Sequence, residues 1–125
     1  MNKPDYNEVE LTPEEKLEVE RFDLDLGDSH TLRFTCWHPD RELNPQYADL
    51  PDVERVGGIV SHINMATGLR CWSGINFDNE VTARVFPDGA RWQVQSMEPL
   101  TLSPSLLCRV CGDHGFIREG KWIKA

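Results

Sequence analysis

The fold is decided by residues 17–37, LEVERFDLDLGDSHTLRFTCW, in which apolar and polar side chains alternate on both sides of GDSH, residues 27–30. Side chains two positions apart point to the same face of a strand, so this pattern is typical of a half-buried β-strand. Glycine and aspartate at the centre favour a turn. Residues 17–37 therefore predict a β-hairpin, with Cys36 on the core face beside Leu32 and Phe34.

The same signals recur through the rest of the chain. Strand-like runs flank NMATG at 64–68 and PDG at 87–89, which predicts two more hairpins. A run at 100–108 is interrupted by Pro104, which places that strand at an edge, and 115–125 predict a last hairpin turning at Glu119 and Gly120. The expected fold is all-β, a small sandwich or distorted barrel of short antiparallel hairpins with a C-terminal zinc-knuckle-like hairpin.

Length favours one domain over residues 1–125. Three segments stand out in it. Residues 1–16 form an acidic N-terminal segment, in which LTPEE predicts at most a short helix. Residues 38–58 carry three prolines and predict a long irregular connection, and 98–125 hold the knuckle and the terminal hairpin.

Charge is concentrated at the start of the chain. Residues 1–28 hold ten acidic and three basic side chains, and the net charge of the whole chain is −8. Phosphate binding needs clustered lysine and arginine, so the composition argues against direct nucleic-acid binding. The acidic surface would suit a basic protein partner, or it serves only solubility. Neither a signal peptide nor a membrane span is recognisable, which predicts a cytoplasmic protein.

The four cysteines indicate a metal site. Cys108 and Cys111 have C-x-x-C spacing just before a glycine, which is typical of a zinc knuckle. Cys36 and Cys71 would complete an all-thiolate set, and His114 offers a variant with three thiolates and one imidazole. The alternatives are four ordinary buried cysteines, or a redox dithiol. The redox reading lacks the helix that would lower the thiol pKa.

The sequence offers no convincing catalytic set. A zinc deaminase pattern is absent, and Ser103 and Ser105 lack the glycines and the helix of a hydrolase elbow. The four histidines are scattered rather than clustered, with His62 interpreted as a strand residue and only His114 beside plausible chemistry. We therefore predict a closed structural zinc site and no catalytic residues.

Residues 98–122 resemble the signature of an uncharacterised family of small bacterial and bacteriophage proteins. The family shares a T-x-S-P-S-L core, a cysteine/histidine element and an F-I-x-x-G-x-W/I hairpin, after a strand that bears a tryptophan. The matching residues are Trp92, Thr101, Ser103, Pro104, Ser105, Leu106, Cys111, His114, Phe116, Ile117, Gly120 and Trp122. The resemblance implies a small β-rich zinc-binding protein, often of phage origin, with no attached catalytic activity.

These observations lead to a functional prediction. We expect a phage-type protein-binding module that targets a host or virion protein and is held by a structural zinc. The alternatives are a zinc-dependent enzyme of unknown substrate and a structural component of the virion.

Overall fold

The computed structural model of the chain describes residues 21–125. The described part contains nine strands, one α-helix and one short 3-10 helix. The elements are β1 (Leu24–Gly27), β2 (His30–Trp37), η2 (Pro45–Tyr47), β3 (Val53–Ile63), β4 (Arg70–Phe77), α2 (Glu80–Val85), β5 (Arg91–Met97), β6 (Leu100–Ser103), β7 (Leu106–Leu107), β8 (His114–Arg118) and β9 (Lys121–Lys124). The all-β prediction is confirmed.

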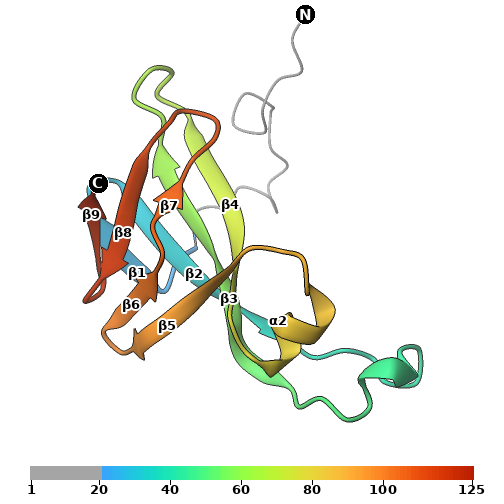
Figure 1. Ribbon diagram of the computed structural model, residues 1–125. Helices are drawn as coiled ribbons and strands as arrows, with labels where there is room; N and C mark the ends of the chain where they lie inside the picture. Colours follow the sequence, from blue (N-terminus) through green and yellow to red (C-terminus); the bar gives the residue numbers. More distant parts are fainter. Residues whose placement is uncertain (1–20) are drawn as a thin grey trace, which may run out of the picture.

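The strands form two sheets that close on each other. The larger sheet has the order β1-β2-β3-β4-β5-β6, and the smaller one has the order β7-β8-β9. All neighbouring strands are antiparallel except β4 and β5. In Figure 1 the large sheet curls, and β8 lies against β6 while β9 lies against β1. The small sheet thus bridges the two ends of the large one and makes a distorted barrel.

The main core fills the space between the two sheets. It is formed by alternate side chains of several strands, as expected for sheets with one buried face. Its buried members are Leu26, Leu32, Val60, Ile75, Phe77, Leu100, Leu102, Leu106, Ile117 and Trp122. A second, smaller core of Leu50, Val56 and Val81 lies beneath the connection between β2 and β3.

Three of the predicted hairpins are confirmed. The chain reverses at 28–29 between β1 and β2, and at 64–69 between β3 and β4. It reverses again between β8 and β9 at Glu119 and Gly120, both of which have positive φ. Pro104 separates β6 from β7, as its lack of an N–H donor predicts.

The hairpin predicted around PDG is wrong, because residues 80–85 form the helix α2 and β5 then runs parallel to β4. The side chain of Asn79 accepts hydrogen bonds from the N–H groups of Val81 and Thr82. The hydroxyl of Thr82 in turn accepts a bond from the N–H of Asn79. This reciprocal capping satisfies the first helical N–H groups and outweighs the strand preference of the β-branched residues.

The long connection is shorter than predicted. Residues 38–52 are irregular and include η2, but 53–58 belong to β3. The predicted helical turn at 12–15 and the acidic segment 1–16 lie outside the described residues. Within residues 21–125 no helix has the length and apolar character needed to cross a membrane.

Candidate metal centre

Four side chains from two separate parts of the fold converge at one point. His62 on β3 and Cys71 on β4 are directly opposite each other in the hairpin, so they share one face of the sheet. Cys108 and Cys111 come from the loop at 108–113 between β7 and β8, which we call the knuckle loop. The four ligand atoms all lie within 4.8 Å of one another, and His62 Nε2 is 3.2 Å from Cys111 Sγ.

The knuckle loop is a tight turn closed by its own backbone. The N–H of Gly112 donates to the carbonyl of Cys108 at 2.8 Å, and the N–H of Cys108 donates to the carbonyl of Asp113 at 2.7 Å. Gly112 has a φ of 80°, a conformation that side-chain-bearing residues rarely adopt. The turn directs the thiols of Cys108 and Cys111 toward the β3–β4 hairpin.

The donor set suits zinc. Three thiols and one imidazole match a common closed tetrahedral arrangement, with bonds of about 2.3 Å to sulfur and 2.0–2.1 Å to nitrogen. Cys71 is 1% exposed and His62 is 6% exposed, while Cys108 and Cys111 are partly exposed. Soft sulfur ligands disfavour magnesium and calcium, which prefer oxygen. The cluster can therefore hold a metal ion of the zinc type.

Burial sets the protonation of the ligands before any metal binds. It raises the pKa of the Cys71 thiol to about 12, and the charges of Cys108 and Cys111 act in the same direction. Burial also raises the pKa of Cys111. For His62 burial lowers the pKa, and the Asp113 carboxylate opposes this only in part. At neutral pH His62 is thus ready to donate its lone pair, whereas Cys71 and Cys111 must each release a proton.

A stack of buried aromatic rings lies next to the cluster. His30 lies between Trp122, at 4.0 Å between ring centroids, and His62, at 5.0 Å. Its Nδ1 is 2.6 Å from the Asp28 carbonyl, and its Nε2 is 2.5 Å from a carboxylate oxygen of Asp113. Asp113 closes the knuckle loop, so this pair ties that loop to the start of β2.

His30, His62 and Asp113 also bring three ligand atoms together. The rings of His30 and His62 are stacked with an interplanar angle of 20°. The lone pairs of imidazole nitrogens lie in the ring plane, so stacked rings direct them side by side rather than toward one ion. The role of His30 and Asp113 is therefore to orient the neighbouring ligand and loop, as partners behind metal ligands commonly do.

The structure assembles only part of the ligand set that the sequence predicts. Cys71, Cys108 and Cys111 come together, but Cys36 is exposed on β2 and belongs to no cluster of metal-binding side chains among the described residues. His114 is also outside the cluster, and its Nε2 pairs with the Ser105 hydroxyl at 2.8 Å. The side chain that supplies a nitrogen atom to the cluster is instead His62, which the sequence analysis did not predict as a ligand.

A signal for His62 was present in the sequence. The turn at 64–69 is closed by the N–H of Asn64, which donates to the carbonyl of Leu69 at 2.7 Å. In a hairpin with that closure, His62 and Cys71 are equally distant from the turn and must face each other. Counting outward from this six-residue turn pairs them, whereas counting from NMATG at 64–68, the turn that the sequence predicts, would have paired His62 with Arg70.

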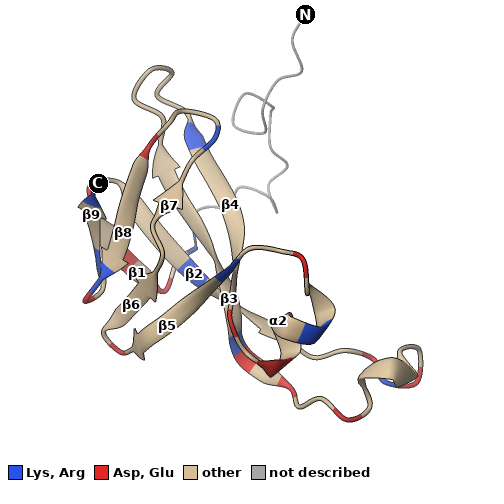
Figure 2. Ribbon diagram, viewed as in Figure 1, with Lys and Arg blue, Asp and Glu red and all other residues tan. Residues whose placement is uncertain are grey.

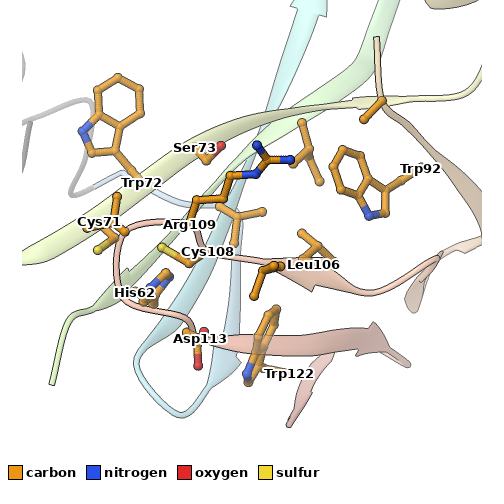
Figure 3. Close-up of a pocket in the computed structure, with 15 residues that line it drawn as sticks. His62, Cys71, Trp72, Ser73, Trp92, Leu106, Cys108, Arg109, Asp113 and Trp122 are labelled. Atoms are coloured by element: carbon orange, nitrogen blue, oxygen red, sulfur yellow. The ribbon is translucent and has the colours of Figure 1, made fainter. Parts of the chain in front are cut away.

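A cavity of about 390 Å³ adjoins the cluster. Figure 3 shows His62, Cys71 and Cys108 at one end of it, Trp92 at the other and Leu106 between them. The metal ligands thus form part of the cavity wall, and the knuckle loop forms its rim. The volume lies within the range of roughly 300–1,000 Å³ that is usual for ligand pockets.

No protein-family model, curated protein or solved structure matches this chain. The resemblance to the family of small bacterial and phage proteins therefore stays a prediction.

Proposed function

We propose that this chain is a protein-binding module whose binding surface is held in shape by one structural zinc. The observation that carries the proposal is the placement of the four ligands. Two come from the β3–β4 hairpin and two from the knuckle loop, so a bound ion would cross-link the two walls of the cavity. A metal at that point would hold the walls of a surface cavity in place, and would not act only on the buried core.

The ligand set favours a structural role for the ion over a catalytic one. Catalytic zinc usually keeps one position open for water, whereas here four protein side chains are available to close the shell. The nearby carboxylate of Asp113 is engaged with His30, so it is not aimed at a metal-bound water. A zinc-dependent enzyme is the second candidate. In such an enzyme one of the four protein ligands would have to leave the metal so that water could bind there.

The partner that we propose is a host or virion protein, in keeping with the family resemblance and with action in the cytoplasm of a bacterial cell. A structural virion component is the remaining alternative. Light scattering of the zinc-loaded protein separates these roles, because a virion component should self-associate at micromolar concentration. A binding module should not self-associate in that measurement. When immobilised, it should also retain a specific protein from a bacterial lysate that is passed over it.

The metal centre itself is tested by elemental analysis and X-ray absorption. We expect about one zinc per chain, with three sulfur neighbours near 2.3 Å and one nitrogen near 2.0 Å. His62→Ala should remove the nitrogen signal and weaken zinc binding, whereas His114→Ala should change neither. Four sulfur neighbours, or an unchanged spectrum in His62→Ala, would show that the ligand set is different.

Zinc affinity is expected to rise with pH. Thiol protons compete with the metal, and the raised pKa values of Cys71 and Cys111 keep those protons on the thiols at neutral pH. Binding then releases at least two protons, one each from Cys71 and Cys111, while His62 adds none once the pH exceeds its lowered pKa. Competition with a chromophoric chelator should give a slope of at least about two when log affinity is plotted against pH.

The matched control for this slope is Cys36→Ser, which alters a cysteine outside the cluster and should leave the slope unchanged. A slope near zero in the unaltered protein would mean that the thiols are already ionised, or that they do not bind the metal.

A further inference from the structure

The cavity beside the metal centre has an apolar interior and one cationic side chain at its rim. Its apolar walls come from both sheets and include Val60, Ile75, Trp92 and Leu106. The cationic group is Arg109, in the knuckle loop between the two cysteine ligands. In Figure 3 the Arg109 side chain extends over the cavity, between Ser73 and Trp92.

Arg109 is not used by the fold. Its side chain is exposed, and it forms no hydrogen bond or ion pair with any described residue. By contrast, Arg41, Arg84 and Arg91 are each paired with an aspartate. Among residues 21–125, the one carboxylate that lines the cavity belongs to Asp113, and it is bonded to His30. The guanidinium therefore remains available to an outside anion.

The cavity mouth carries one basic side chain in a chain that is acidic as a whole. Figure 2 shows a basic and an acidic position in the knuckle loop, while acidic positions gather around α2 and the connection before β3. The basic residue that lines the cavity is Arg109, and the acidic one, Asp113, is bonded to His30, in a chain whose net charge is −8. A positive charge that no described residue pairs favours a negatively charged group at this mouth.

Two exposed apolar side chains flank the arginine. Val110, which directly follows Arg109, is 42% exposed, and Leu107, which precedes Arg109 by two residues, is 60% exposed. Protein interfaces have an apolar core, and arginine is one of the residue types enriched in them and in their energetic hot spots. These residues extend the apolar cavity outward into a surface on which a chain segment can rest.

We propose that the cavity binds an acidic protein segment, which inserts one bulky apolar side chain and pairs a neighbouring carboxylate with Arg109. This inference rests on the proposed function and names its partner by chemistry. The apolar walls accept an aromatic or large aliphatic side chain, and the guanidinium can bind a carboxylate with two parallel hydrogen bonds. Because the arginine lies between two zinc ligands, the metal would fix its position at the cavity mouth.

Selection from a random heptapeptide display library on the zinc-loaded protein tests the proposal. We expect enriched peptides to combine an aromatic or large aliphatic residue with aspartate or glutamate within about two positions. A synthetic fluorescent copy of the strongest peptide should lose affinity by tenfold or more with Arg109→Glu. Lys124→Glu, which makes the same charge change at an exposed residue of β9 that does not line the cavity, should change the affinity less than twofold.

Zinc content and melting temperature of both variants should match those of the unaltered protein, since the side chains of Arg109 and Lys124 are exposed and form no hydrogen bond or ion pair with any described residue. Enriched peptides without an acidic residue, or equal binding to Arg109→Glu, would overturn the inference, as would a selection that enriches nothing. The proposed function is judged separately by lysate capture, which does not assume an acidic segment. If a captured protein still binds the Arg109→Glu variant, the protein-binding function stands, but Arg109 and its cavity are not the binding site.

Discussion

Cys108→Ser is expected to abolish stoichiometric zinc binding and to lower the free energy of unfolding by about 4 kcal/mol or more. Serine replaces a thiolate ligand with a hydroxyl that binds zinc poorly, and the energy of metal binding is part of the folding energy of such a domain. The domain also has its own apolar core. The variant should therefore remain partly folded while the knuckle loop separates from the β3–β4 hairpin.

The measurement is urea unfolding of both proteins at equal zinc concentration, together with metal analysis. Cys36→Ser is the matched control, because it makes the same substitution at an exposed cysteine outside the cluster. It should change stability by less than about 0.5 kcal/mol and keep one zinc per chain. Equal losses in the two variants would place the metal elsewhere, and a stable Cys108→Ser protein with full zinc would remove Cys108 from the ligand set.

Gly57→Ala is expected to be as damaging as loss of the metal, for a purely steric reason. A Cβ at Gly57 on β3 would lie 2.1 Å from the carbonyl oxygen of Ile75 on β4. That atom is backbone in a paired strand, so no side chain can rotate away. The strands must move apart, at a cost above the 1–3 kcal/mol that is usual for overpacking. We expect a loss of about 4 kcal/mol.

Gly74→Ala provides the control on the partner strand. A Cβ there meets nothing within 4 Å, and Gly74 is paired with Ile59 in the same ladder. Its substitution should leave the melting temperature within a few degrees of the original, since alanine is no worse than glycine in a strand. Thermal unfolding followed by circular dichroism compares the two variants. Similar melting temperatures would mean that β3 and β4 are not closely packed at Gly57.

Most of the sheet can be predicted from the sequence because the interactions that define its strands and turns are local. The turn residues around 28 and 66 define where strands reverse, and Leu24, Leu26 and Leu32 alternate at the spacing of a strand. Residues 80–85 show the limit of that reasoning. Their β-branched side chains resemble a strand, but a hydrogen-bonded cap at Asn79 begins a helix instead.

The candidate site was only partly readable. The C-x-x-C spacing identified Cys108 and Cys111, and the search for further ligands identified Cys71. The alternation in β2 placed Cys36 on the core face beside Leu32, which the structure contradicts. The register between β2 and β3 shifts between Thr35 and Trp37, and a bulge at that point re-aims the side chains beyond it.

By itself the sequence determined the all-β class, most of the hairpin turns and the presence of a cysteine knuckle. Each of these depends on residues within a few positions of one another, where side-chain chemistry and backbone preference act directly. Only the tertiary structure decided that His62 completes the cluster, that Cys36 does not, and that an arginine lies over the cavity beside it. These outcomes depend on how strands far apart in the chain are paired, and a shift of one residue in a strand turns a side chain to the opposite face.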